Sequence, residues 1–195
     1  MTAIDETAQD IIFRKARTHN GWTDKPVDDS LLEKLYDLCK WGPTSANCTP
    51  MRLVFVKSKE AKERFKPLLD AGNQKKAVQA PVTAIIGMDM KFYDQLPKLF
   101  PQADAKSWFE GNEEKVKITA LRNSSLQGAY FIIAARSLGL DCGPMSGFDN
   151  AKVDAEFFKD TSYKSNFICS IGYGDPAKLY PRNPRLPFSE ACKIV

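Results

Sequence analysis

The chain has 195 residues, a net charge of +4 and a single histidine, His19. One histidine excludes metal sites that need two imidazole ligands, and any Ser–His–Asp or Cys–His centre would rest on His19 alone. The basic residues form no run of five or six, so the composition does not support nucleic-acid binding. The length predicts one domain, and, if the chain is an enzyme, its single histidine favours chemistry carried by a bound cofactor.

The five cysteines are widely spaced, odd in number and without a C-x-x-C pair, which is typical of free thiols in a reducing compartment. The N-terminal residues mix acidic and apolar side chains, unlike a secretory signal. The longest uncharged apolar stretch, residues 128–135, is too short to span a bilayer. We therefore expect a soluble cytoplasmic protein that binds neither membranes nor nucleic acid.

Hydrophobic periodicity and turn residues predict a mixture of helices and strands. Ser30 and Glu33 can form a capping box at the start of the second helix. In chain order, the predicted elements are a helix over 5–18, a helix over 30–41, a strand over 52–56, a helix over 59–69, a strand over 82–86, an irregular segment over 90–111, a long helix over 113–138, a loop over 141–148, a helix over about 150–158 and a strand over 166–171.

The last 20 residues contain four prolines, at positions 176, 181, 184 and 187. Such a density of proline disfavours regular structure and predicts an extended arm over about 176–195. An arm of this length needs a surface to lie on, and in a small protein that surface is often a partner subunit. The order of helices and strands indicates an α+β fold, with strands packed against long helices.

Four segments combine residue types suited to ligand binding. Hydroxyl-rich loops and paired glycines bring backbone groups close to a ligand, and arginines distant in sequence can converge on a phosphate. Each segment also has an ordinary interpretation, as a connecting loop, as solvated lysines or as surface charge. The four are Trp41–Pro50, Asn73–Lys76, Gly143–Phe148, and Arg17–Asn20 together with Arg182 and Arg185.

In their order along nearly the whole chain, these segments resemble the FMN-dependent nitroreductase family. The residues that carry the resemblance are the run RTHNGW at 17–22, PTSANCTP at 43–50, Asn73 with Lys76 for an N-x-x-K element, and GLDCGPMSGFD at 139–149. Within the family, the runs ARTHNGW, KWGPTSANC, LGLDCGPMSGFD and IGYGDPAKLY look most similar to the RutE-type malonic semialdehyde reductases. The chain departs from the family pattern at Ala16, Asn20, Thr49 and Ser146.

The resemblance implies a nitroreductase-like α+β fold with an antiparallel or mixed central sheet. It also implies an intertwined homodimer with FMN at the subunit interface, NADH or NADPH as reductant, and no metal. By position, it assigns the FMN phosphate to Arg17, Thr18 and Arg185, with Asn20 and Arg182 nearby. It implies that Asn73 and Lys76 contact the polar edge of the flavin. It places Pro144, Ser146 and Gly147 near the reactive nitrogen of the ring. It also implies that the FMN of the partner subunit is contacted by Pro43, Thr44, Ser45 and Asn47.

The expected activity is reduction of a small acceptor by NAD(P)H through FMN, with Lys76 stabilising charge on the flavin. For the RutE type, the acceptor would be malonic semialdehyde, giving 3-hydroxypropionate in pyrimidine (uracil) degradation, with Trp108 and Arg122 as candidate substrate residues. Three alternatives remain open: a broad nitroaromatic or quinone reductase, a flavin-binding protein without turnover, and a Cys–His hydrolase built on His19.

Overall fold

The structure, a computed structural model, describes residues 2–195. Its centre is a four-stranded sheet in the order β1-β2-β4-β3, and every neighbouring pair is antiparallel. The sheet elements are β1 (Met51–Val56), β2 (Val82–Asp89), β3 (Asp141–Met145) and β4 (Tyr163–Gly172). The expected α+β class is confirmed, and the sheet is antiparallel throughout.

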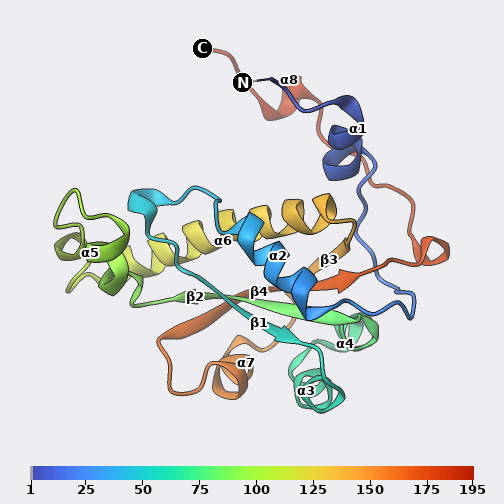
Figure 1. The fold of residues 1–195 in the computed structure, drawn as a ribbon, viewed down its shortest axis with the longest axis horizontal. Helices are drawn as coiled ribbons and strands as arrows, with labels where there is room; N and C mark the ends of the chain where they lie inside the picture. Colours follow the sequence, from blue (N-terminus) through green and yellow to red (C-terminus); the bar gives the residue numbers. More distant parts are fainter. Residues whose placement is uncertain (1) are drawn as a thin grey trace.

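Helices cover both faces of the sheet (Figure 1). One face carries α2 and α6, and the opposite face carries α3, α4 and α7. The remaining short helices lie in the N-terminal segment, in the segment after β2 and near the C-terminus. The bounds are α1 (Glu6–Gln9), α2 (Asp29–Cys39), α3 (Lys59–Phe65), α4 (Ala71–Gln79), α5 (Leu96–Leu99), α6 (Glu113–Ser137), α7 (Asn150–Phe157) and α8 (Phe188–Ala191).

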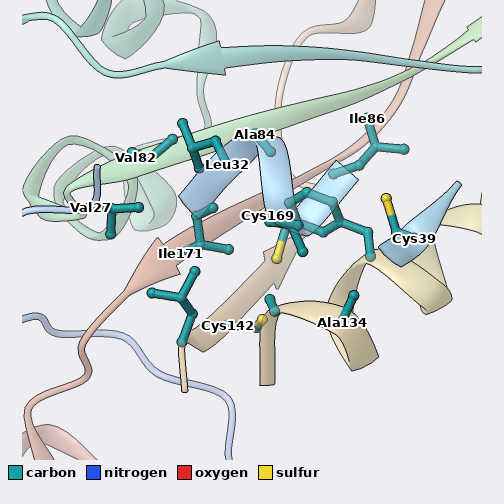
Figure 2. Close-up of a cluster of buried hydrophobic side chains, with 14 of the residues drawn as sticks. Val27, Leu32, Cys39, Val82, Ala84, Ile86, Ala134, Cys142, Cys169 and Ile171 are labelled. Atoms are coloured by element: carbon teal, nitrogen blue, oxygen red, sulfur yellow. The ribbon is translucent and has the colours of Figure 1, made fainter. Parts of the chain in front are cut away.

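Strand β2 is buried on both faces because its neighbouring side chains alternate between two hydrophobic cores. Ala84 and Ile86 pack with Leu32 of α2 in the first core, which Figure 2 shows. Ile85 packs with Phe65 of α3 in the second core. This continuous apolar run explains why β2 could be recognised from sequence.

The predicted loop over 141–148 is wrong, because residues 141–145 form strand β3. Pro144 has no N–H to donate, and Gly143 has low strand propensity, so the segment DCGPM reads as a turn. Strand β3 lies at the edge of the four-stranded sheet, and its outer side carries an isolated bridge at Cys142 in place of a full strand. An edge strand tolerates proline for that reason.

The predicted first helix over 5–18 is also wrong in its extent. Helix α1 and a following π-helical turn end at Arg14, and the chain then runs extended beside β3, with a parallel bridge between Thr18 and Cys142. The capping box predicted for Ser30 and Glu33 is absent too. Helix α2 begins one residue earlier, at Asp29, and its N-terminus has no side-chain cap.

The termini lie at the same end of the molecule, where α1 and α8 stand away from its body (Figure 1). Beyond a short 3-10 turn at Pro176–Lys178, the C-terminal arm has regular structure only in α8, and most of its residues are exposed. Within residues 2–195, no helix is both long and apolar enough to cross a membrane. All five cysteines are free thiols, and four of them are buried.

Candidate functional site

A cleft of about 600 Å³ opens between the N-terminal segment, the end of α6 and the C-terminal arm. Four arginines line it, and none of its lining residues is acidic. We call it the basic cleft. Its lining residues are Phe13, Ala16, Arg17, Thr18, Asn20, Arg136, Tyr180, Pro181, Arg182, Asn183 and Arg185.

Two hydrogen bonds connect the opposite walls of the basic cleft. The Arg17 guanidinium donates to the carbonyl of Tyr180, and the Arg182 guanidinium donates to the carbonyl of Ala16 at 2.9 Å. The N-terminal segment and the C-terminal arm therefore each bind an arginine side chain of the other. The five residues predicted near a phosphate, Arg17, Thr18, Asn20, Arg182 and Arg185, are thus brought together.

The arginines of the basic cleft have no carboxylate within ion-pair distance among residues 2–195. Elsewhere, Arg52 and Arg64 lie 2.7 and 2.6 Å from the carboxylates of Asp89 and Glu156. Unpaired guanidinium groups gathered in one cleft create a strongly positive potential. Their planar, permanently charged groups are suited to bidentate binding of a phosphate.

His19 lies between Thr18 and Asn20 of the basic cleft in the chain, does not line the cleft itself, and is 7% exposed. Its Nε2 is 3.3 Å from a carboxylate oxygen of Asp141, and the other oxygen accepts a 2.8 Å hydrogen bond from the backbone N–H of Gly174. His19 therefore contacts a structural carboxylate of β3. Burial raises the pKa of the Cys39 and Cys48 thiols to about 11, so both stay protonated at neutral pH. This geometry gives no support to a Cys–His hydrolase.

A second groove, of about 480 Å³, adjoins the basic cleft, and Asn20 and Tyr180 line both. It contains Lys75 and Lys76 of α4 and Lys178 of the arm, and we call it the lysine groove. The backbone carbonyl of Lys76 accepts a 3.1 Å hydrogen bond from the indole N–H of Trp22. This bond fixes α4 beside the extended N-terminal segment, so Lys76 lies next to the basic cleft.

The amide of Asn73 donates a 2.9 Å hydrogen bond to the carbonyl of Gly147. A Cβ at Gly147 would come within 2.6 Å of the side chains of both Asn73 and Asp70, so only glycine fits without rearrangement. The bond joins α4 to the turn that follows Pro144 and contains Ser146. The structure thus joins the Asn73–Lys76 segment to the turn of Ser146 and Gly147.

The other predicted residues do not line the basic cleft of the same chain. The loop that holds Pro43, Thr44, Ser45 and Asn47 is fixed elsewhere: the Ser45 N–H donates to Asn123 of α6 at 2.8 Å, and Asn47 donates to the carbonyl of Leu99 at 2.8 Å. We call this loop, together with Trp108 and Arg122, the distal group.

Trp108 and Arg122 lie by the first half of α6. Lys115, in the first turn of α6, donates to the Trp108 carbonyl at 2.8 Å, and it shares a shallow depression with Arg122. Arg136, which lines the basic cleft, is in the last turn. A helix of 25 residues is about 37 Å long, so the distal group and the cleft are well separated.

Sequence reasoning missed Arg136, Phe13, Tyr180 and Asn183 as residues of the cleft. Arg136 is the most informative of these residues. It lies in the C-terminal turn of a long helix, where the helix dipole favours any basic residue, so its presence there does not indicate a binding site. No group of three or more His, Cys, Asp or Glu side chains able to hold a metal ion occurs in the described part of the chain.

Comparison with known proteins agrees with this architecture. The profile of the Nitroreductase family matches residues 14–173. A protein from Burkholderia lata, named as a candidate NADH dehydrogenase/NAD(P)H nitroreductase, is 61% identical over 194 residues, which cover 100% of both chains. A candidate nitroreductase structure from Bacillus subtilis has a TM-score of 0.87, 22% identity, and covers 94% of this chain and 97% of that one. Another, from Exiguobacterium sibiricum in complex with FMN, has a TM-score of 0.84 and 22% identity, covering 100% and 99%.

Proposed function

This chain belongs to the nitroreductase family, and we propose that it binds FMN and transfers hydride from NADH or NADPH to a small acceptor. The observation that carries the proposal is the basic cleft. Its arginines have no carboxylate near them in the described residues, and they gather beside the groove that contains Lys76. A ligand with a phosphate group and a larger polar moiety fits this arrangement, with the phosphate in the cationic cleft and the rest of the ligand in the adjoining groove.

The residues present fit FMN on chemical grounds. Arg17, Arg182 and Arg185 match the charge of a phosphate monoester, and Thr18 and Asn20 offer hydrogen bonds to its oxygens. Arg136 lines the same cleft without a carboxylate partner in the described chain, which leaves its charge available to an anionic ligand. No acidic side chain lines the cleft and opposes a phosphate.

When bound, FMN supplies the hydride-transfer chemistry for which protein side chains are not suited. The protein residues bind and orient it. We assign the phosphate to the basic cleft and the polar edge of the ring to Asn73 and Lys76, with the backbone of Ser146 and Gly147 close by. Lys76 is half-buried and has no carboxylate within ion-pair distance in residues 2–195, so its charge is free to stabilise negative charge that develops on the ring.

We propose that residues 1–195 form one domain and that the active protein is a homodimer. Support comes from α6, whose side chains Ile118, Leu121, Leu126 and Tyr130 are 40–46% exposed on an otherwise well-packed helix. An exposed apolar surface of this kind is typical of an interface. Two copies packed in opposite directions along α6 would place the distal group of one beside the basic cleft of the other.

The C-terminal arm and α1 support the same arrangement. Both project beyond the body of the fold (Figure 1), and the arm exposes large apolar side chains at Leu186 and Phe188. A second copy would give these side chains a surface to cover. We therefore assign residues 176–195 to the surface of the partner subunit, and Pro43, Thr44, Ser45 and Asn47 to its FMN.

Malonic semialdehyde is the acceptor that we propose, giving 3-hydroxypropionate in pyrimidine degradation. The proposal rests on the sequence runs that resemble the RutE type. Its carboxylate needs a cation, and Arg122 is an exposed arginine without an ion pair among residues 2–195. In the proposed dimer, Arg122 and Trp108 would reach the partner's site, because both belong to the distal group. The five free thiols suit a cytoplasmic enzyme.

A broad nitroaromatic or quinone reductase is the second candidate. Trp108 is 45% exposed and packs edge-to-face on Phe100, with their ring centroids 6.1 Å apart, so part of its planar apolar ring is accessible to a ligand. Such a surface would favour flat acceptors over a small carboxylate. The names of related proteins point the same way.

The deciding experiment measures bound cofactor first and turnover second. We expect the purified protein to carry flavin in a 1:1 ratio to the chain and to oxidise NADH or NADPH when an acceptor is added. The ratio of kcat/KM for malonic semialdehyde to that for a nitroaromatic then decides between the two candidates. A protein that neither carries FMN nor gains thermal stability from it would disprove the proposal. Bound FMN without turnover on any acceptor would indicate a flavin-binding protein.

A further inference from the structure

The Arg136 side chain occupies an unusual environment at the end of α6. Its Nη1 donates a 3.0 Å hydrogen bond to the carbonyl of Ile12, while its Nε is buried and has no acceptor in the described residues. No carboxylate lies within ion-pair distance of it in that part of the chain. A guanidinium carries five N–H donors, so most of its hydrogen-bonding capacity remains unused.

The position of Arg136 in its helix does not explain this arrangement. A cation in the last turn of a helix is favoured by the helix dipole, which accounts for the residue type. The side chain, however, bonds to Ile12 in the N-terminal segment and lines the basic cleft. Burying an unpaired N–H of a charged group is unfavourable unless an acceptor is supplied. Nε itself is buried, so an anion in the cleft would meet the guanidinium at its Nη groups and would balance its charge.

We propose that Arg136 is a phosphate-binding residue of the basic cleft, acting with Arg17, Arg182 and Arg185 on the terminal phosphate of the flavin. The inference rests on the proposed binding of FMN and adds a specific prediction to it. Arg136 enters the cleft from a rigid helix, whereas Arg182 and Arg185 enter from the arm. Its charge is therefore held in place before the ligand binds, which favours affinity.

The test compares FMN with riboflavin, which has the same ring and ribityl chain but no phosphate. Flavin-free protein is titrated with each ligand, and binding is followed by flavin fluorescence. We expect Arg136→Met to raise the Kd for FMN about 10-fold to 100-fold, equivalent to about 1.4–2.7 kcal/mol, and to leave the Kd for riboflavin within about threefold. Arg136→Lys keeps the charge and should recover most of the loss.

Arg64→Met is the matched control. Arg64 of α3 pairs with Glu156 of α7, and both helices lie on the face of the sheet opposite α6. This variant should leave the affinities for both ligands unchanged. Thermal unfolding of the flavin-free variants separates folding from binding. Arg136→Met should unfold near the wild-type temperature, because losing the hydrogen bond to Ile12 is offset by removing a buried N–H that has no acceptor.

Equal weakening of FMN and riboflavin by Arg136→Met would overturn the inference and indicate a structural role. An unchanged Kd for FMN would overturn it as well. Both outcomes leave the proposed function standing, since the wild-type protein would still bind FMN. A wild-type protein that binds neither ligand would instead disprove the proposed function itself, and the inference with it.

Discussion

Asp141 contacts His19 with one carboxylate oxygen, at 3.3 Å from Nε2, and accepts the Gly174 N–H with the other at 2.8 Å. His19 lies between Thr18 and Asn20, which line the basic cleft, and Gly174 lies directly before the C-terminal arm. A single carboxylate on the edge strand β3 therefore fixes both walls of the cleft. The single histidine of the chain has a positioning role in this arrangement.

Gly174→Ala should disturb this arrangement directly. A Cβ at Gly174 would overlap the imidazole ring of His19. Overpacking of this kind costs about 1–3 kcal/mol, so we expect the free energy of unfolding to fall by about 2 kcal/mol and the affinity for FMN to fall with it. Chemical denaturation and flavin titration measure the two effects.

Gly72→Ala is the control for stability. A Cβ at Gly72, in α4, meets no atom within 4 Å, and alanine is favoured over glycine in a helix. We expect this variant to be about 0.5–1 kcal/mol more stable than the wild type. If Gly174→Ala were as stable as Gly72→Ala, the close packing of His19 against Gly174 would be wrong.

Lys76→Ala should slow reduction of the bound flavin by NAD(P)H about tenfold or more, because it removes the charge that we assign to the polar edge of the ring. The midpoint potential should fall by on the order of 30 mV, which is about 1.4 kcal/mol for two electrons. The fold should persist, since Trp22 bonds to the backbone of this residue.

Stopped-flow absorbance and a redox titration measure these two quantities. Lys75→Ala is the comparison, because Lys75 is the exposed neighbour of Lys76 in the same groove. We expect its effect on the potential to be much smaller. An unchanged potential in Lys76→Ala would remove the role assigned to that residue.

Leu121→Arg tests the proposed dimer. It places a charge in the exposed apolar surface of α6, and burying that charge in an interface should raise the dimer dissociation constant at least about 100-fold. Light scattering after gel filtration should show a monomer, and FMN should be lost with the dimer because the distal group comes from the second copy. Ala151→Arg, on α7 at the opposite face of the sheet, should remain dimeric. A monomeric wild-type protein that binds FMN tightly would contradict the arrangement.

Asp175 makes the start of the arm sensitive to acid. The Ala177 N–H and then Lys178 lower the pKa of Asp175 from its usual value of 3.8. A carboxyl whose pKa is lower in the folded state stabilises the fold above pH 3.8, and this contribution is lost as pH falls through the folded pKa. Asp175→Asn should therefore lower Tm at pH 7, and the difference from the wild type should shrink below pH 4. A difference that stayed the same from pH 7 to a pH below the folded pKa would contradict this account.

The elements with strong periodicity could be predicted from sequence, and those shaped by tertiary contacts could not. Helix α6 is long and strand β2 is continuously apolar, so the sequence predicts both within a few residues of their observed bounds. Strand β3 was missed because its proline and glycine are tolerated only at a sheet edge, which local sequence does not reveal. The first helix was extended too far because the bridge of Thr18 to β3 replaces helical hydrogen bonds with contacts distant in sequence.

The residues that we propose bind the phosphate could be predicted as a set because a resemblance connects arginines more than 160 residues apart, and the cleft brings them together. Arg136 was missed because its environment depends on how α6 ends against the N-terminal segment. Its single sequence signal, a cation in a helical C-terminal turn, is shared with many surface residues. Burial and hydrogen bonding were needed to distinguish it.

The C-terminal arm provides Arg182 and Arg185, yet few contacts hold its first half against the cleft, among them the bonds between Arg17 and Tyr180 and between Arg182 and Ala16. Fixing the backbone of one residue costs about 1–2 kcal/mol of conformational entropy. The observed affinity for a phosphate would then equal the contact energy minus the entropy lost by the arm. Any change that restricts the free arm, such as an additional proline at a compatible position, should tighten binding without touching the ligand.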